Sequence, residues 1–371
     1  MRRLVAVPAV PGPELYQALW AAIDGSGPAV LPVSTDPAEA VHVLTALQPE
    51  LPVEQDVCLV VPTSGSTGEP KGVLLTADCL LASARAAMTY LGGPGSWWLP
   101  LPVTHIGGLQ VVLRSLLAGA EPRLGALPRE ATYCSLVPTQ LRRLLVTHPA
   151  ELACYEAVLL GGAAAPPDLL DAALAARVRV VTTYGMSETS GGCVYDGVPL
   201  PGVSVDVADQ IVLSGPVVAR GYRLRPDLTA ASFAGDCFTT ADLGQMVNGR
   251  LHVLGRADDL IVTGGEKVAP LAVEAALAGH PAVVDVVVVG VPDADWGSRV
   301  VAVVVLRAGL TLGDARNVVA AAVSRVAAPR ELVVVEALPH VSGGKVDRAA
   351  AKLLAFDAVA HAAAADPEQG P

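Results

Sequence analysis

A segment rich in glycine and hydroxyl side chains, Thr63–Gly72, carries the clearest chemical signal in the sequence. It reads Thr-Ser-Gly-Ser-Thr-Gly-Glu-Pro-Lys-Gly and lies between two apolar runs. Glycines let backbone N–H groups approach a phosphate closely, and hydroxyl groups add further donors. Lys71 supplies a mobile positive charge suited to the outer phosphates of a nucleotide. The segment therefore predicts a phosphate-binding loop, in which the expected binding residues are Thr63, Ser64, Gly65, Ser66, Thr67, Gly68 and Lys71.

This loop differs from a Walker A motif, because that motif has serine or threonine after its lysine, whereas Gly72 follows Lys71 here. A flexible surface linker is the alternative interpretation, since segments rich in glycine and serine also connect domains. A linker rarely joins a buried strand to an apolar run anchored by a lysine. We therefore favour phosphate binding.

The elements that must position this loop alternate short β-branched runs with segments rich in alanine and leucine. We expect a strand at Cys58–Val61 that ends at the loop, and a helix at Leu80–Tyr90 after it. Two further strands are expected at Val158–Leu160, before Gly161, and at Val178–Val181. Repetition of strand, turn and helix predicts the α/β class, with layered, partly parallel sheets in a large N-terminal domain.

The pattern changes after about Gly255, where a small α+β module of about 100 residues is expected. Its expected elements are a helix at Ala269–Ala278, strands at Val283–Val289 and Val300–Val305, a helix at Asp314–Val326 and a strand at Leu332–Val335. From about Phe356 the alanine-rich end of the chain predicts a flexible tail. The expected domains are therefore 1–255 and 256–355, followed by a tail at 356–371.

Composition and charge restrict the class of protein. Hydrophobic residues make up 52% of the 371 residues and charged residues 16%, which supports a large core and excludes global disorder. The net charge of −11 argues against an extended nucleic-acid surface, so no nucleic-acid partner is expected. A small anionic ligand remains compatible with this charge, because a few local donors suffice to bind phosphate.

Cysteine spacing and hydropathy predict a cytoplasmic enzyme. None of the six cysteines forms a CxxC pair, so we expect small reduced core residues rather than zinc ligands. The first apolar run stops at Pro8, which is too early for a signal peptide. The longest apolar stretch, Val283–Val291, contains Asp285 and is too short to span a bilayer. No stable membrane insertion is therefore expected.

The string Ser64–Gly72 resembles the phosphate loop of the adenylate-forming superfamily, which includes acyl-CoA synthetases, adenylation domains of peptide synthetases and luciferases. Further segments resemble the motifs of that superfamily and follow in the same order, namely Gly161–Ala164, Tyr184–Thr189, Phe238–Asp242, Gly255–Ile261, Gly264–Val268 and Pro339–Arg348. One glycine loop alone would be weak evidence. Ordered motifs that extend from residue 63 to residue 348 are specific.

The resemblance implies an ATP site with a magnesium ligand. In the family, the aromatic ring at the position of Tyr184 stacks near adenine, the hydroxyl at Ser187 meets phosphate, and the carboxylate at Glu188 ligates Mg²⁺. Ser187 stands where threonine is commoner and keeps the hydroxyl group. A carboxylate beside phosphates is a favourable Mg²⁺ ligand. The nucleotide-binding residues implied by these motifs are Gly161, Gly162, Ala163, Tyr184, Gly185, Met186, Ser187, Asp242 and Arg256.

Two of these residues belong to the motifs at Phe238–Asp242 and Gly255–Ile261, which the resemblance relates to the ribose and to a hinge. Asp242 is implied to accept hydrogen bonds from the ribose hydroxyls, although Ala241 replaces the glycine that is usual in the family. Arg256 is implied to help hold the ribose. Asp258 corresponds to the pivot of a hinge.

The C-terminal motifs imply a small mobile domain that serves two reaction steps. Lys345 corresponds to the family's catalytic lysine, which bridges the acyl carboxylate and the nucleotide during adenylation. Gly264 and Gly265 correspond to the loop that moves in for thioester formation with CoA. We therefore expect acyl-adenylate formation followed by transfer to a thiol.

The segment Leu99–Leu109 resembles the part of the family that lines the acyl pocket. Together with Arg114–Gly119 and Gly191–Leu200, it is similar to the o-succinylbenzoate–CoA ligases of menaquinone biosynthesis in their short actinobacterial form. That substrate carries a second carboxylate and a ketone, so its pocket needs polar donors. The residues expected to contact the acyl substrate are His105, Arg114 and Ser190, with His105 also expected to be catalytic.

Several alternatives stay open at this point. His105 could be a structural histidine beside a glycine turn, and Arg114 a solvated helix residue. Another aryl- or acyl-CoA ligase, or an adenylation enzyme that loads a carrier protein, would share the same motifs. A nucleotide-binding paralogue without turnover is disfavoured, because Lys71, Glu188 and Lys345 are all present.

The phosphate loop begins at residue 63, much nearer the N-terminus than in most members of the superfamily, so a shortened N-terminal domain is expected. The implied partners are a small-molecule carboxylic acid, ATP and CoA, with Mg²⁺ as the cofactor. The sequence leaves open the oligomeric state, a homo-oligomer included. It also leaves open the orientation of the domains and the number of metal ions.

Overall fold

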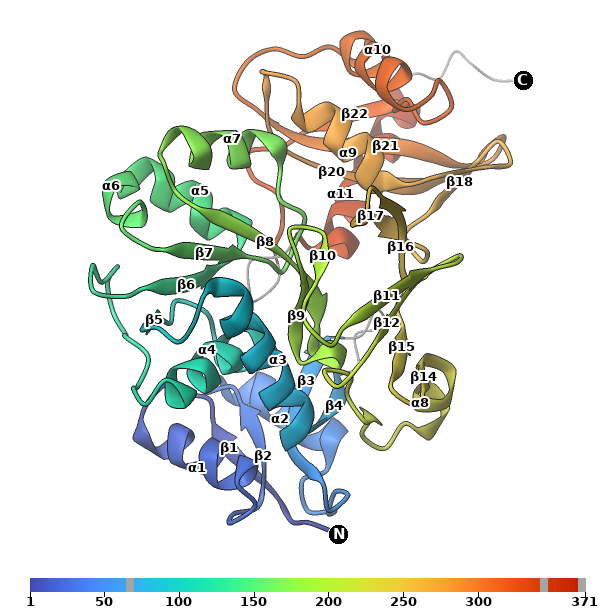
Figure 1. Cartoon of the computed structure of the whole chain (residues 1–371). Helices are drawn as coiled ribbons and strands as arrows, with labels where there is room; N and C mark the ends of the chain where they lie inside the picture. The colour runs from blue at the N-terminus through green and yellow to red at the C-terminus, as the bar shows by residue number, and fades with distance from the viewer. Residues whose placement is uncertain (65–69, 341–345, 366–371) are drawn as a thin grey trace. The chain divides into compact units, whose positions relative to one another are not determined.

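The structure is a computed structural model that describes residues 1–64, 70–340 and 346–365 (Figure 1). The chain divides into two compact units. Unit 1 comprises residues 1–165, 172–240 and 246–251, and unit 2 comprises residues 166–171, 241–245 and those from 252 onwards.

Unit 1 is built on three sheets. The first has the order β1-β2-β3-β4-β13 and consists of β1 (Leu4–Pro8), β2 (Ala29–Val33), β3 (Val57–Ser64), β4 (Pro70–Thr76) and β13 (Gly221–Tyr222). The second has the order β10-β9-β8-β7-β6-β5 and consists of β5 (Trp97–Trp98), β6 (Tyr133–Leu136), β7 (Ala157–Leu160), β8 (Val180–Met186), β9 (Gly191–Tyr195) and β10 (Val198–Pro199). The third has the order β11-β12-β15-β14 and consists of β11 (Ser204–Val207), β12 (Ile211–Ser214), β14 (Phe233–Ala234) and β15 (Cys237–Thr239).

The first two sheets mix parallel and antiparallel pairs. β1, β2 and β3 run parallel, and β4 then pairs antiparallel with β3. β5, β6, β7 and β8 also run parallel, and β9 continues their sheet antiparallel. The predicted α/β class with layered, partly parallel sheets is therefore confirmed.

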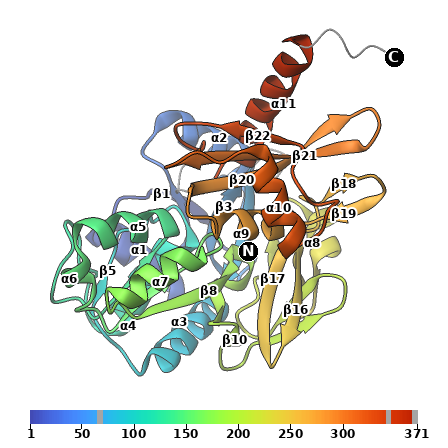
Figure 2. The same cartoon turned by 90° about the horizontal axis from the view of Figure 1, so that it is seen from above.

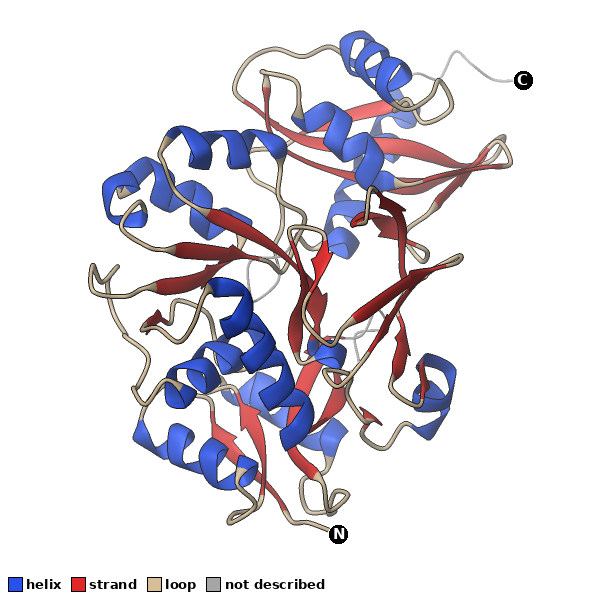
Figure 3. Cartoon of the chain, in the orientation of Figure 1, coloured by secondary structure: helices blue, strands red, loops and turns tan. Residues whose placement is uncertain are grey.

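Helices connect the strands of the first 240 residues (Figure 3). They are α1 (Pro13–Ile23), α2 (Pro37–Leu47), α3 (Ala77–Leu91), α4 (Ile106–Leu117), α5 (Pro138–Thr147), α6 (Pro149–Leu152), α7 (Pro167–Ala175), α8 (Pro226–Ser232) and the 3₁₀ helix η1 (Ser187–Thr189). α3 contacts β3, β4 and β9, while α4 contacts α3, β5, β6 and β9. These two helices therefore lie between the first and second sheets.

The predicted phosphate loop joins two strands of a hairpin. In β3 and β4, Thr63 lies opposite Lys71 and Ser64 lies opposite Pro70. The sequence pattern predicted a strand followed by a helix. The run after Lys71 first forms buried β4, and α3 begins only after Thr76, whose hydroxyl accepts a hydrogen bond from the Cys79 amide. Of the predicted loop residues, Gly65, Ser66, Thr67 and Gly68 lie outside the described residues.

Unit 2 contains a sheet of order β20-β21-β22, formed by β20 (Val283–Asp293), β21 (Gly297–Leu306) and β22 (Glu331–Val334). Its helices are α9 (Pro270–Ala278), α10 (Leu312–Ala322) and α11 (Arg348–Ala365). Alternate residues of β20 and β21 face opposite sides of the sheet. One set, which includes Val288, packs against α9 and α10, and the other, which includes Val287, packs against α11 (Figure 2).

Two hairpins connect unit 1 to this sheet along the chain. They are formed by β16 (Asp242–Val247) with β17 (Arg250–Arg256), and by β18 (Ile261–Thr263) with β19 (Glu266–Val268). The predicted strand at Val178–Val181 begins later, as β8. The predicted helix at Asp314–Val326 is α10, which ends four residues earlier than expected.

The prediction of a flexible tail from Phe356 is wrong as far as Ala365, because α11 continues to that residue. Alanine is the strongest helix former, and Ala351 and Ala355 are fully buried against the sheet. Beyond Phe356, the partly buried Val359 packs against the same cluster, so packing continues into a part of the chain that composition alone predicted as flexible. Neither α11 nor any other helix in the described ranges is long and apolar enough to cross a membrane.

The cysteines differ in exposure, and this difference predicts the order in which an alkylating reagent labels them. Cys58 and Cys193 are buried, and desolvation raises the pKa of each thiol to about 12. Cys154 is exposed and Cys237 is half-buried, so the expectation of six core cysteines holds for four of them. Because the thiolate is the reactive form, brief iodoacetamide treatment of native protein should label Cys154 first. Mass spectrometry checks this, and early labelling of Cys58 would contradict the buried position.

Candidate active site

Three side chains link the base of the predicted phosphate loop to the predicted metal ligand. The ammonium nitrogen of Lys71 lies 5.7 Å from the ring centre of Tyr222. The Tyr222 hydroxyl donates a hydrogen bond of 2.7 Å to Oε1 of Glu188. The Glu188 carbonyl accepts a hydrogen bond of 2.8 Å from the Ala219 amide. The fold thus brings a cation suited to phosphate and a carboxylate suited to a metal next to the same aromatic ring.

The turn that carries Glu188 is held by its neighbour Thr189, which is fully buried. The Thr189 hydroxyl donates to the Gly191 carbonyl at 2.8 Å and accepts from the Met186 amide at 3.0 Å. A buried polar group with partners on both sides of a turn restricts its backbone. The position of Glu188 is therefore set by the chain rather than by solvent.

Ser190, which the sequence predicted as an acyl-contacting residue, lies in the same turn with a left-handed backbone (φ 55°). Its hydroxyl donates to the Val217 carbonyl at 2.8 Å, and its side chain is fully buried. Its carbonyl accepts hydrogen bonds from Ser83 Oγ at 3.0 Å and Gln110 Nε2 at 2.8 Å. In this structure Ser190 joins α3, α4 and the turn, and contact with a substrate stays a prediction.

The predicted adenine-side residues lie at the carboxyl ends of two neighbouring parallel strands, β7 and β8. A Cβ atom on Gly161 would lie 2.4 Å from Thr183 Oγ1, and one on Gly185 would lie 2.2 Å from the Gly191 carbonyl oxygen. Only glycine fits at either position, so the backbones approach closely beside Tyr184. The other residues predicted here lie in the same two loops, namely Gly162, Ala163, Met186 and Ser187.

His105 is the residue that precedes α4, and its side chain is exposed. Its Nδ1 lies 2.8 Å from the hydroxyl of Thr104, which fixes the ring near the start of the helix. A catalytic role for His105 and its contact with the acyl substrate stay predictions.

Arg114 is buried on the same helix, with only 5% of its surface exposed, so the alternative of a solvated arginine is wrong. Its Nε donates to the Gln110 carbonyl at 2.9 Å, and its guanidinium carbon lies 4.2 Å from the centre of the Trp97 ring. Burial lowers the pKa of Arg114, and only the neighbouring Tyr195 opposes this shift. Within the described ranges, Arg114 has no carboxylate partner and its Nη1 has no hydrogen-bond partner.

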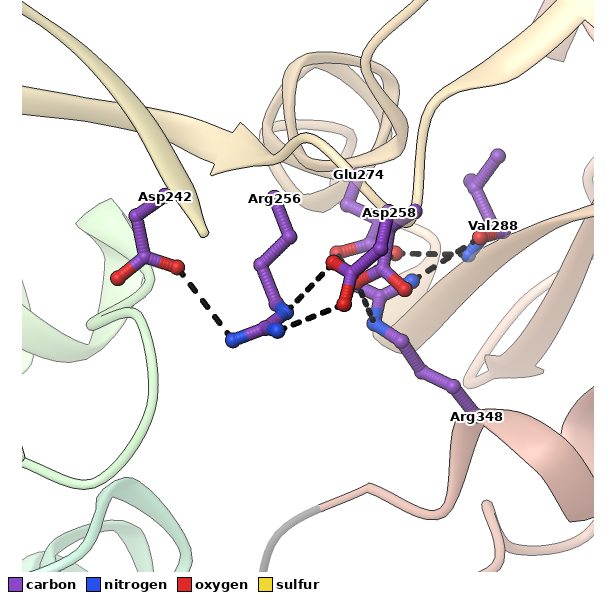
Figure 4. Close-up of polar contacts among 7 residues, drawn as sticks. Asp242, Arg256, Asp258, Glu274, Val288 and Arg348 are labelled. Atoms are coloured by element: carbon purple, nitrogen blue, oxygen red, sulfur yellow. Dashed lines mark hydrogen bonds and ion pairs between the residues drawn. The ribbon is translucent and has the colours of Figure 1, made fainter. Parts of the chain in front are cut away.

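In unit 2, the structure brings Asp242, Arg256 and Asp258 together (Figure 4). Arg256 forms a bidentate pair with Asp258, with Nε–Oδ1 at 2.9 Å and Nη2–Oδ2 at 2.7 Å. Its Nη1 lies 3.6 Å from Oδ1 of Asp242. The hydrogen bond to Asp258 raises the pKa of Arg256. The predicted ribose-binding residues and the predicted hinge aspartate therefore form one charged group.

Gly264 and Gly265, predicted for the thioester step, form the exposed turn between β18 and β19, with φ values of 57° and 82°. The Gly264 amide donates to the Trp296 carbonyl at 3.0 Å. Lys345, the predicted catalytic lysine, lies outside the described residues. Within the described ranges, no group of three or more His, Cys, Asp or Glu residues could hold a metal ion.

Sequence analysis missed Tyr222, which contacts both Lys71 and Glu188. It lies in a strand of two residues, so hydrophobic periodicity gives no signal there. The one local signal is an aromatic residue directly after Gly221, followed by Arg223 and Arg225. Its importance comes from the pairing of β13 with β4, which joins segments about 150 residues apart in the chain.

Several known proteins are similar to this chain over most of its length. A protein from Mycobacterium tuberculosis called "Probable 2-succinylbenzoate--CoA ligase" is 48% identical over 368 residues, which cover 91% of this chain and 94% of that protein. The structure of MenE from Bacillus subtilis in complex with the acyl-adenylate intermediate OSB-AMP is 26% identical, with a TM-score of 0.79 over 94% of this chain and 87% of that one. Wild-type E. coli MenE, with a bound analogue of OSB-AMS, is 28% identical, with a TM-score of 0.78 over 97% of this chain and 88% of that one.

Two family models match most of the chain between them. Residues 20–223 match the AMP-binding enzyme model, and residues 272–345 match the AMP-binding enzyme C-terminal domain. The first match covers the strands and turns that carry Lys71, Glu188 and Tyr222. This chain belongs to the AMP-binding enzyme family.

Proposed function

We propose that the chain is an AMP-forming acid–thiol ligase that converts o-succinylbenzoate, ATP and CoA to o-succinylbenzoyl-CoA, AMP and diphosphate. The observation that carries the proposal is the 48% identity, over nearly the whole length of both proteins, to the M. tuberculosis protein named as such a ligase. The similarity to a MenE structure that holds the OSB-AMP intermediate supports an acyl-adenylate route. We also propose a cytoplasmic location.

The chemistry requires activation of a poor electrophile. A carboxylate oxygen attacks the α-phosphorus of ATP, the bond to the bridging oxygen of diphosphate breaks, and a mixed anhydride with AMP results. Negative charge spreads over the phosphoryl oxygens in the transition state, so positioned donors and cations accelerate the step. Lys71 and the loop that follows Thr63 are the groups we assign to the diphosphate. Gly161, Tyr184 and their loops are assigned to the adenine.

Mg²⁺ fits the position of Glu188. A magnesium ion at a nucleotide site is commonly held by one or two carboxylates together with substrate phosphates. Glu188 has its Oε1 fixed by Tyr222, and we assign its Oε2 to the ion, since no described residue is hydrogen-bonded to it. When bound, the ion would neutralise phosphate charge. The described residues contribute the orientation of Glu188 and the nearby charge of Lys71.

We assign two roles to unit 2, which we equate with the mobile C-terminal domain at 256–355. In the first step, Lys345 contacts the acyl carboxylate and the nucleotide while Asp242 and Arg256 hold the ribose. In the second step, rotation about Asp258 brings the Gly264-Gly265 turn to the adenylate. The CoA thiol then attacks the acyl carbon, and AMP leaves with the bonding electrons.

The acyl pocket is assigned to the region around α4. The second carboxylate of o-succinylbenzoate requires a cation, and Arg114 is a buried cation that lacks a carboxylate partner among the described residues. His105 lies at the start of the same helix with an exposed ring suited to the keto group or the reacting carboxylate. Their shared helix gives the pocket a fixed geometry.

The test is ATP–diphosphate exchange with a panel of carboxylic acids, followed by addition of CoA or of a carrier protein. We expect exchange with o-succinylbenzoate in the absence of CoA, and a thioester only with CoA. Stronger exchange with another aryl acid would show that this acid, rather than o-succinylbenzoate, is the substrate. Transfer to a carrier protein in preference to CoA would identify the chain as an adenylation enzyme that loads a carrier protein.

The contact between Tyr222 and Glu188 predicts a modest defect in nucleotide binding. Tyr222→Phe keeps the ring beside Lys71 and removes a hydrogen bond worth about 1 kcal/mol, so the KM for Mg·ATP should rise roughly fivefold. Steady-state kinetics at varied Mg·ATP measures this. Tyr155→Phe is the matched control, because it removes a partly buried 2.7 Å hydrogen bond to the Pro128 carbonyl. An equal rise in KM for both variants would contradict a specific role for Tyr222.

A further inference from the structure

Arg114 carries a buried charge that no acidic side chain of the described residues neutralises. Its Nε donates to the Gln110 carbonyl at 2.9 Å, one turn earlier on α4. Its Nη1 is buried and has no hydrogen-bond partner within the described part of the chain. A buried charge without an acidic partner is unfavourable. The fold must therefore stabilise this guanidinium by other contacts.

Two aromatic side chains supply these contacts. The guanidinium carbon of Arg114 lies over the ring of Trp97, 4.2 Å from its centre, and Trp97 is fully buried on β5. The face of an aromatic ring attracts a cation, most strongly for tryptophan and in a desolvated site. Tyr195 on β9 is the second neighbour. Burial raises the pKa of its hydroxyl, and the charge of Arg114 and a hydrogen bond from it oppose that rise.

A tryptophan partner leaves the arginine available to a ligand, whereas an internal carboxylate would not. A carboxylate binds in the plane of a guanidinium, at the edge that carries the N–H groups. The Trp97 ring lies against a face of the Arg114 guanidinium, so it does not block this edge or the unpartnered Nη1. An internal aspartate or glutamate would compete with the ligand for the same donors. The contact therefore keeps Arg114 charged and ready for a carboxylate of the substrate.

Trp97 is itself held in place by the second sheet. Its carbonyl accepts a hydrogen bond of 2.7 Å from the Arg123 amide, and it lies opposite Tyr133 in the pairing of β5 with β6. The rings of Trp97 and Tyr133 pack with their centres 5.0 Å apart, and the Tyr133 hydroxyl donates to the Leu91 carbonyl at 3.2 Å. Among the described residues, the buried Nε1 of Trp97 has no partner. The indole thus brings an unpaired donor into the core, which is unfavourable, and its contact with the guanidinium offsets that cost.

We propose that Trp97 is a positioning residue for Arg114 and thereby determines the preference of the enzyme for an acid with a second carboxylate. The proposal rests on the role assigned to Arg114 in the proposed function. An arginine side chain has many rotamers, and holding it against the ring removes this freedom before the substrate binds. Loss of the ring should therefore weaken recognition of the second carboxylate and leave recognition of the rest of the acid nearly unchanged.

Two monoacids measure this preference in ATP–diphosphate exchange. 4-Oxo-4-phenylbutanoate lacks the benzoate carboxylate of o-succinylbenzoate, and o-butyrylbenzoate lacks the aliphatic one, so one of the two keeps the carboxylate that is activated. The measured quantity, called here the diacid preference, is kcat/KM for o-succinylbenzoate divided by kcat/KM for the reactive monoacid. In Trp97→Leu we expect it to fall roughly 10- to 30-fold, with the KM for ATP and kcat/KM for the monoacid near their wild-type values. Trp97→Phe keeps an aromatic face, so the fall should be smaller, roughly threefold.

A double variant shows whether Trp97 acts through Arg114. In an Arg114→Met background, Trp97→Leu should not lower the diacid preference further, because the two residues act as one unit.

Trp98→Phe is the matched control, since Trp98 is the next residue of β5 and faces the other side of the sheet. Its Nε1 donates to the Gly125 carbonyl at 3.1 Å. This variant loses the same ring volume as Trp97→Phe and a hydrogen bond besides. Its melting temperature should therefore fall at least as far, while its diacid preference keeps the wild-type value.

The proposal is overturned if the Trp97 variants keep the wild-type diacid preference, if the effects of Trp97→Leu and Arg114→Met multiply, or if exchange with both acids falls in parallel with the melting temperature. Trp97→Phe keeps the test valid if Trp97→Leu does not fold. The wild-type protein tests the proposed function separately. Absence of wild-type exchange with every acid would overturn that function, whereas exchange without any diacid preference would overturn the role of Arg114 and this proposal with it.

Discussion

Lys345→Ala is expected to reduce acyl-adenylate formation by a factor on the order of 10²–10³, because it removes the cation that meets charge developing on the phosphoryl group. The thioester half-reaction from supplied acyl-adenylate should continue, since the lysine is assigned to the first step alone. Rapid-quench measurement of acyl-AMP in the absence of CoA gives the first rate. Thioester formation from the supplied adenylate gives the second.

Lys352→Ala is the matched control for this experiment, because Lys352 is an exposed lysine on α11, seven positions after Lys345 in the sequence, and has no assigned role. It should adenylate at the wild-type rate. If Lys345→Ala retained full adenylation, the assignment of Lys345 would be wrong. An equal loss in both half-reactions would indicate damage to unit 2 rather than loss of one catalytic group.

Arg114→Met is expected to separate substrate recognition from stability. Loss of charged hydrogen bonds to the second carboxylate, worth about 1.5–3 kcal/mol, should lower kcat/KM for o-succinylbenzoate roughly 10- to 100-fold. The KM for ATP should not change. Stability should be equal to that of the wild type or higher, because the guanidinium is buried without a carboxylate among the described residues and one of its nitrogens has no partner.

Arg223 provides the contrast, because it is buried to the same degree, with 4% exposed. Its guanidinium donates to four backbone carbonyls, those of Leu47, Gln48, Leu51 and Pro52. Arg223→Met leaves these carbonyls without their donor and should destabilise unit 1 by about 3 kcal/mol or more. Urea unfolding measures both variants. A large loss of stability in Arg114→Met, with unchanged kcat/KM for o-succinylbenzoate, would show that Arg114 is structural.

The sequence predicted those parts of the fold that short-range patterns determine. The β-branched runs became β3, β7, β20 and β21, because such residues fit a pleated, buried sheet. The glycines at positions 161 and 185 could be chosen from motif order alone, and the structure gives the reason, since no side chain fits at either one. Helix ends were less predictable, as the later end of α11 shows, because the packing of Val359 against the sheet cannot be seen in the local sequence.

Long-range pairing explains what the sequence could not predict. The exposure of Arg114 depends on the packing of α4 between two sheets, and an arginine near a helix end is usually solvated. Tyr222 meets Glu188 only because β13 adds to the sheet of β4. Glu274 and Arg348, which form an ion pair, are 74 residues apart, and neither residue type nor local spacing identifies them as a pair.

The central claim is that this chain activates o-succinylbenzoate as an adenylate and transfers it to CoA. The most direct measurement follows AMP and acyl products by mass spectrometry after incubation with ATP, Mg²⁺ and o-succinylbenzoate, with and without CoA. The account predicts o-succinylbenzoyl-AMP without CoA, and o-succinylbenzoyl-CoA with stoichiometric AMP when CoA is present. Formation of neither product, or activity no greater than that with benzoate, would contradict it.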